Sequence, residues 1–196
     1  MVKTIVGGVL GGIVAFAWGW VFWGILPFAM NEIHQFSDEA AVQQTVMMNA
    51  PEAGIYMFPH CGGHKTASEP AQQELKKKAM EQMANGPIAI VSVNPNGTGP
   101  FNQLLIQGLV ISVVGGLLIA LLLSMTRIEN FFSQVLFVTG VGLTAGVLCI
   151  VPDWNWWGVP INWVAVRFAD VLIGWFLAGL VIAGTFSCPV LAKSKR

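Results

Sequence analysis

Four long apolar runs alternate with polar segments along the chain. The runs cover residues 4–28, 101–125, 131–151 and 159–186. A helix that crosses a bilayer needs about 20 mostly apolar residues, and each run reaches that length. We therefore predict an all-α membrane protein built on a bundle of four transmembrane helices, numbered in chain order.

The segment 29–100 is polar and has start and stop signals for regular elements. Ser37-Asp38-Glu39 before an apolar stretch predicts a helix that ends near Pro51, and Ser68-Glu69-Pro70 predicts a second helix that ends near Gly86. The runs 54–58 and 87–93 are rich in β-branched and aromatic residues and predict strands. We expect a small α/β cap between spans one and two, on the extracytoplasmic side.

Basic residues near the span ends predict the orientation. Lys3, Arg127 and the tail 187–196 fall on one side of a four-span chain, whereas the turn 153–159 on the other side has no Lys or Arg. Cytoplasmic loops are enriched in these residues. Tryptophans late in span one and before span four fit an aromatic belt at the outer interface. We therefore expect cytoplasmic N- and C-termini and a first span that is not a cleaved signal.

Composition supports a lipid environment and excludes one class of partner. Hydrophobic residues make up 55% of the chain, charged residues make up 10%, and mean hydropathy is +0.66. These values depart from soluble averages toward membrane proteins. Formal net charge is zero and no basic stripe is present, so we expect no nucleic-acid partner.

Small residues in the spans predict close helix packing. Glycine lets two helix backbones approach each other within a membrane. The candidates for this packing are Gly7, Gly11, Gly12, Gly142 and Gly146. The contacts could be made within the chain, with a partner membrane protein, or in a homo-oligomer.

Charged residues inside span four form the first candidate site. Arg167 and Asp170 are three residues apart, so they share a helix face and can neutralise each other; alternatively, Arg167 reaches toward the interface. Counted by depth, Gln107 and Thr144 lie at a similar level. The four residues could form an intramembrane polar site for a proton, ion, quinone or lipid headgroup, as in a small transporter. They could equally be structural hydrogen bonds between helices.

The cap holds the second candidate, the cluster His60, Cys61 and His64. Imidazole and thiolate ligands suit copper or zinc, so metal handling on the outer face is one hypothesis. A loop with chance ligands is the alternative, as is a disulfide from Cys61 to Cys149. The sequence contains no common hydrolase, phosphate-binding or dinucleotide-binding motif, and we expect no catalytic residues.

One resemblance covers the first half of the chain. Trp18-Gly19-x-x-x-Trp23-x-x-Leu26-Pro27, Gly54-Ile55-Tyr56, Pro59 and Gly86-Pro87 resemble a group of small, uncharacterised bacterial four-span proteins of the inner (cytoplasmic) membrane. The resemblance implies this localisation but does not indicate which activity the protein has. The glycines, together with the missing catalytic set, favour an accessory or scaffolding subunit that packs with a partner complex or with itself.

Overall fold

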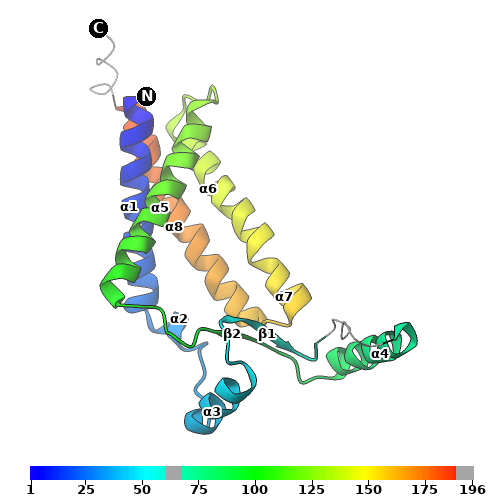
Figure 1. Cartoon of the computed structure of the whole chain (residues 1–196). Coiled ribbons are helices and arrows are strands. Elements are labelled where there is room, and N and C mark those ends of the chain that lie inside the picture. Colours follow the sequence, from blue (N-terminus) through cyan, green and yellow to red (C-terminus); the bar gives the residue numbers. More distant parts are fainter. Residues whose placement is uncertain (61–67, 189–196) are drawn as a thin grey trace. The chain divides into compact units, whose positions relative to one another are not determined.

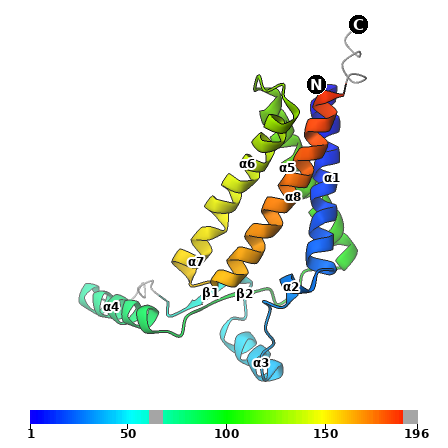
Figure 2. The ribbon, with the colours of Figure 1, turned by 180° about the vertical axis from the view of Figure 1, so that it is seen from behind.

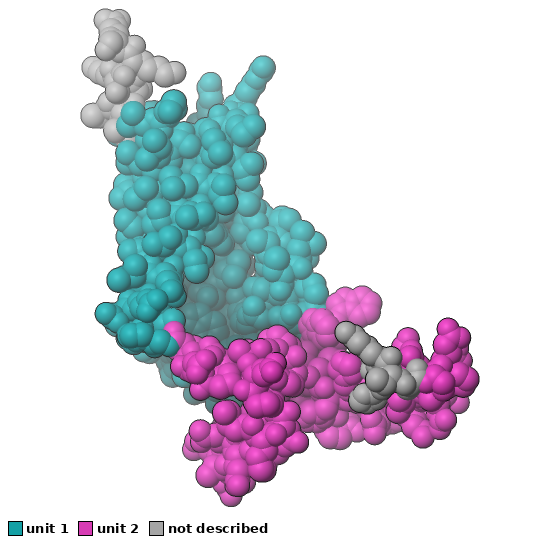
Figure 3. Space-filling view, in the orientation of Figure 1, with its two compact units in different colours: residues 1–34, 99–155, 159–196 teal, residues 35–98, 156–158 magenta. Residues whose placement is uncertain are grey.

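The structure, a computed structural model, describes residues 1–60 and 68–188, apart from the side chain of Phe28. The elements in chain order are α1 (Val2–Gly24), α2 (Pro27–Met30), α3 (Glu39–Asn49), β1 (Gly54–Phe58), α4 (Glu69–Asn85), β2 (Ala89–Val93), α5 (Phe101–Ser124), α6 (Phe131–Cys149), α7 (Val151–Trp157) and α8 (Ile161–Ser187). They belong to two compact units (Figure 3). Unit 1 comprises Met1–His34, Gly99–Asn155 and Val159–Arg196, and unit 2 comprises Gln35–Thr98 and Trp156–Gly158.

Four helices of the described chain are long and apolar enough to cross a membrane. They are α1, α5, α6 continued by α7, and α8, with mean hydropathies between 1.9 and 2.5. Only 17–28% of the most apolar window of each helix is buried within the chain. Large side chains such as Ile111 and Leu136 therefore point outward. Four such helices with apolar outer faces indicate a multi-pass membrane protein in a lipid environment.

Unit 2 contains two helices and a two-stranded antiparallel sheet. Gly54 pairs with Val93 at one end of the sheet, and Phe58 pairs with Ala89 at the other. The helix predicted from Ser37-Asp38-Glu39 is α3, whose first turn is capped by the Asp38 carboxylate, which accepts a hydrogen bond from the Ala41 N–H at 2.9 Å. The sequence also predicted α4 and both strands, although β2 begins two residues later than the run 87–93.

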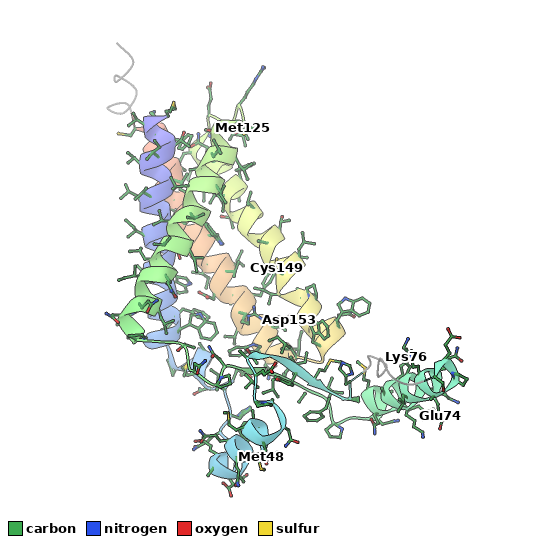
Figure 4. All side chains as sticks on the ribbon, viewed as in Figure 1. Met48, Glu74, Lys76, Met125, Cys149 and Asp153 are labelled. Carbon is green, nitrogen blue, oxygen red and sulfur yellow. The ribbon has the colours of Figure 1, made fainter. Side chains whose placement is uncertain are left out.

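The helices of unit 2 bury little of their own surface. No residue of α3 is buried, and Ala79 is the one buried residue of α4. On α4, Lys78 Nζ lies 2.9 Å from a carboxylate oxygen of Glu74, and this hydrogen bond lowers the pKa of Glu74. Figure 4 labels Glu74 and Lys76 on this helix. The surface of α4 is thus solvated and charged.

In unit 1, α1 packs against both α5 and α8, and α6 packs mainly against α8. Figures 1 and 2 show α1, α5 and α8 side by side near the N-terminus. Here α1 presents glycines: a Cβ atom on Gly12 would lie 2.5 Å from Val113 Cα, and one on Gly11 would lie 2.6 Å from Ile182 Cγ1. Gly7 faces the side chain of Thr185 in the same way. Helix backbones approach this closely only where a side chain is missing.

A second close contact joins α6 to α8. A Cβ atom on Gly142 would lie 2.5 Å from Trp175 Cβ, and one on Gly146 would lie 3.1 Å from the Phe168 ring. All five glycines that the sequence marks for helix packing therefore pack against other helices of this same chain. Next to these contacts is the buried core formed by Ile119, Ala120, Leu123, Val138 and Ile182.

One element of the four-helix unit differs from the prediction: the helix α7. The sequence predicted a turn over 153–159, but residues Val151–Trp157 form α7, so most of that segment is helical. Proline is accommodated in the first turn of a helix, and an acidic residue such as Asp153 is favourable there, so these residues begin a helix instead of ending one.

At the opposite end of unit 1, Lys3 Nζ donates a hydrogen bond of 2.6 Å to the carbonyl of Phe186, which places the start of α1 beside the end of α8.

Candidate functional site: a groove beside Asp170

A groove of about 600 Å³ lies between α1, α5 and α8 in unit 1. Figure 3 shows that the surface of unit 1 is hollowed on the face in view. The aromatic side chains that line the groove are Phe16, Trp18, Trp20, Trp23, Phe101 and Trp175. Among its described lining residues, Asp170 is the one charged side chain and Ser112 carries the one hydroxyl. The groove is thus aromatic and apolar, with a single carboxylate.

Two tryptophans of α1 hold Asp170 in place. Trp23 Nε1 donates a hydrogen bond of 2.7 Å to Asp170 Oδ2, and Trp18 Nε1 donates one of 3.2 Å to the Asp170 carbonyl. A short hydrogen bond to an ionised oxygen is stronger than a neutral one. These bonds therefore fix both the carboxylate and the distance between α1 and α8 at this level.

The tryptophans are themselves positioned by their neighbours. Trp23 packs edge-on against the ring of Trp163, with centroids 5.5 Å apart, and against buried Phe22 at the same distance. Trp18 fits because Gly174 faces it: a Cβ atom on Gly174 would lie 3.0 Å from Trp18 Cδ1. The missing side chain at Gly174, one helical turn after Asp170, makes room for the indole.

Trp175 closes the groove on another side. Its Cβ faces Gly142 of α6, and its ring edge lies 3.2 Å from where a Cβ atom on Gly115 of α5 would stand. Trp175 therefore lies between two glycines of different helices, and its ring is held at the groove wall. Changes at either glycine would move this wall.

Arg167 does not pair with Asp170. Its Nη1 donates a hydrogen bond of 2.6 Å to Asp153 Oδ2 on α7, and the two side chains are 35% and 29% exposed. Figure 4 labels Asp153, just beyond the end of α6. A long basic side chain can extend toward the more polar end of its helix, and here it finds a carboxylate there. Asp170 faces α1 instead, so the pairing suggested by their spacing is wrong.

The other two residues of the predicted polar layer lie outside the groove. Thr144 is exposed, and its hydroxyl donates to the Gly140 carbonyl of its own helix at 2.8 Å. Gln107 is exposed and, within the described chain, makes no hydrogen bond to Arg167 or Asp170. Of the four predicted residues, Asp170 alone lines the groove.

The candidate metal cluster lies mostly beyond what the structure describes. Cys61 and His64 are outside the described residues, and His60 is exposed. Within residues 1–60 and 68–188, no three His, Cys, Asp or Glu side chains converge as a metal site. Cys149, the suggested disulfide partner of Cys61, is exposed at the end of α6 (Figure 4).

Sequence reasoning missed how the tryptophans are used. Trp18 and Trp23 were assigned to an interfacial belt, and Trp175 was not singled out. One signal was available: Trp163, Asp170 and Gly174 recur at helical spacing on one face of α8. In the structure, this face receives the indoles of Trp18 and Trp23 from α1.

Comparison with known proteins found no matching family model, no matching curated protein and no matching solved structure.

Proposed function

We propose that this chain is a non-catalytic integral-membrane protein that binds a small amphiphilic molecule in the groove between α1, α5 and α8. The observation that carries the proposal is the groove itself, whose volume of about 600 Å³ holds one fixed carboxylate among aromatic walls. Ligand sites typically measure about 300–1,000 Å³ and combine apolar walls with a few placed polar groups.

The position of Asp170 in a transmembrane helix supports a binding role. An acidic side chain inside a membrane costs at least ~2.5 kcal/mol on insertion scales, so such residues mark functional sites by default. A purely structural role as a link between helices would need only the bonds to Trp18 and Trp23. Yet Asp170 also lines the groove, where its carboxyl group is the one charged side chain among the described lining residues.

The proposed orientation places the groove in the outer half of the membrane. The start of α1 and the loop between α5 and α6 lie at the same end of unit 1 (Figures 1 and 2), and these segments carry Lys3 and Arg127. The groove is lined instead by the last part of α1 and the first half of α5. Basic residues favour the cytoplasm. The same reasoning, with the resemblance noted above, supports a bacterial inner membrane, cytoplasmic termini and an extracytoplasmic unit 2. The groove would then open to amphiphiles of the outer leaflet.

The two other hypotheses from the sequence remain predictions. An accessory or scaffolding subunit was favoured by the glycines, but the glycines marked for packing contact helices of the same chain, so this observation no longer favours a partner. Copper or zinc handling depends on Cys61 and His64, which lie outside the described residues. The groove therefore carries the stronger argument.

The proposal is tested by filling the groove without disturbing the helix contacts. Gly19 lines the groove and has no atom within 4 Å of the position where its Cβ atom would stand. Gly19→Leu therefore adds a side chain at the groove whose Cβ atom meets no other atom. Gly140→Leu is the matched control, because Gly140 is an equally uncrowded helical glycine that does not line the groove.

The measurement is mass spectrometry of small molecules and lipids that stay bound to protein purified from its native membrane. We expect a bound amphiphile in the wild type and in Gly140→Leu, and a loss of most of it in Gly19→Leu. Equal retention in all three proteins would refute binding in this groove.

A further inference from the structure

We propose that the occupant of the groove is a lipophilic organic cation, such as a tertiary or quaternary ammonium compound with an apolar body. This inference rests on the proposed function and adds the charge and chemical class of the ligand. The carboxylate of Asp170 has no cationic partner within the described chain.

Two basic residues of unit 1, Arg167 and Lys3, have partners other than Asp170. Arg167, the basic residue closest in sequence, forms its ion pair with Asp153. Lys3 donates to the Phe186 carbonyl at the other end of α8. The groups that do contact Asp170 are indole N–H donors, which are neutral. Charges inside membrane segments pair with opposite charges or with water, so the groove lacks one positive charge.

The aromatic walls of the groove can also bind a cation. A cation over the face of an aromatic ring is attracted by the ring quadrupole, most strongly for tryptophan, and this is a common way to bind quaternary ammonium groups. Four tryptophans and two phenylalanines line the groove around Asp170. Aromatic faces together with one carboxylate recognise a positive charge on an apolar molecule, whereas an anion would meet the carboxylate without any compensating donor from a basic residue.

The experiment uses the full chain in nanodiscs of uncharged lipid and three probes. Tetraphenylphosphonium is a lipophilic cation, tetraphenylborate is an anion of the same shape, and triphenylmethanol is a neutral aromatic molecule. Binding is measured by equilibrium dialysis against empty nanodiscs. The variants are Asp170→Asn, Asp170→Glu, Gly19→Leu and Asp153→Asn, the last of which removes a carboxylate outside the groove.

We expect saturable binding of tetraphenylphosphonium and much weaker binding of tetraphenylborate. Asp170→Asn should lower affinity for the cation at least about tenfold, as loss of a charge-assisted contact does. Asp170→Glu should retain most of the binding, and Asp153→Asn should bind like the wild type. The Glu variant keeps the test valid if Asp170→Asn fails to fold.

The failure of this inference is distinguishable from failure of the proposed function. Equal affinity of Asp170→Asn and wild type for the cation, or equal affinity of wild type for cation and anion, would overturn the cationic ligand. If triphenylmethanol then still bound in a manner sensitive to Gly19→Leu, the groove would stand as a site for neutral amphiphiles. If no probe bound in a manner sensitive to Gly19→Leu, both proposals would fall.

Discussion

The contact between α1, α5 and α8 has two ends that differ in residue size: small residues line one end, and large aromatic residues line the other. At the glycine end, defined by Gly8, Gly12 and Gly116, backbone lies against backbone: a Cβ atom on Gly116 would stand 2.7 Å from Gly12 N. At the tryptophan end, defined by Trp18, Trp23 and Trp175, large rings stand between the helices and a groove remains. Residue volume thus decides where this bundle closes and where it opens.

The two ends also differ in the forces that hold them. The glycine end depends on close packing, which in lipid replaces the hydrophobic effect as the source of helix association. The tryptophan end depends on hydrogen bonds from Trp18 and Trp23 to Asp170. A closed apolar contact therefore stabilises the helices, while an adjacent polar contact keeps a cavity in fixed geometry.

The largest effect is expected from a side chain placed at the glycine end. In Gly12→Leu the new Cβ would lie 2.5 Å from Val113 Cα and 2.6 Å from the Ser112 carbonyl oxygen. Backbone cannot move aside as a side chain can, so we expect a loss of at least ~3 kcal/mol in the free energy of unfolding, at the upper end for overpacking. Unfolding in mixed micelles measures this loss. Gly140→Leu, which meets open space, should stay within ~0.5 kcal/mol of the wild type.

A smaller effect is expected from Gly142→Ala, where the added methyl group meets Trp175 instead of backbone. The nearest atom is Trp175 Cβ, which does not move when the ring rotates, so α6 must shift against α8. This shift should cost about 2 kcal/mol and move Trp175 at the groove wall, so both unfolding and probe binding should change. Gly140→Ala is the control and has the opposite expected sign, since alanine is favoured over glycine in a helix by ~0.5–1 kcal/mol. Equal stability of the two variants would show that Trp175 is not held where the structure places it.

Some features of the fold and of the groove were predictable from the sequence and others were not. The difference is whether a feature depends on residues close together in the chain or on contacts between helices. The four apolar helices and the start of α3 at Ser37-Asp38-Glu39 were readable from the sequence, because both depend on residues close together in the chain. The helix α7 was not readable in this way, since proline near its start fits the beginning of a helix as well as the end of one. The partner of Arg167 and the contact of Trp23 with Asp170 depend on which helix faces are adjacent, which local patterns leave open.

Trp23→Phe removes the hydrogen bond to Asp170 while it keeps a ring against Phe22 and Trp163. We expect a loss of about 1.5 kcal/mol, the scale of a hydrogen bond to a charged group. Trp163→Phe is the matched control: Trp163 contacts the same ring cluster but forms no hydrogen bond to Asp170, so its loss should be smaller. Equal losses would mean that ring packing, and not the bond to Asp170, holds this end.

The smallest effect is expected for the ion pair of Arg167 with Asp153. Both side chains are about one-third exposed, so solvent screens the pair and its coupling energy should be no more than ~1 kcal/mol. A double-mutant cycle with Arg167→Gln and Asp153→Asn measures it. A coupling several times larger would place this pair in a less polar environment than its exposure indicates.

The central claim is that the tryptophan end of the bundle holds an open groove around Asp170 in the membrane. The most direct test is cryo-electron microscopy of the protein in lipid nanodiscs, made rigid by a bound antibody fragment. We predict elongated non-protein density beside Asp170, between α1, α5 and α8, in the wild type and its absence in Gly19→Leu. Helices packed together along their whole length, with no space beside Asp170, would contradict the account.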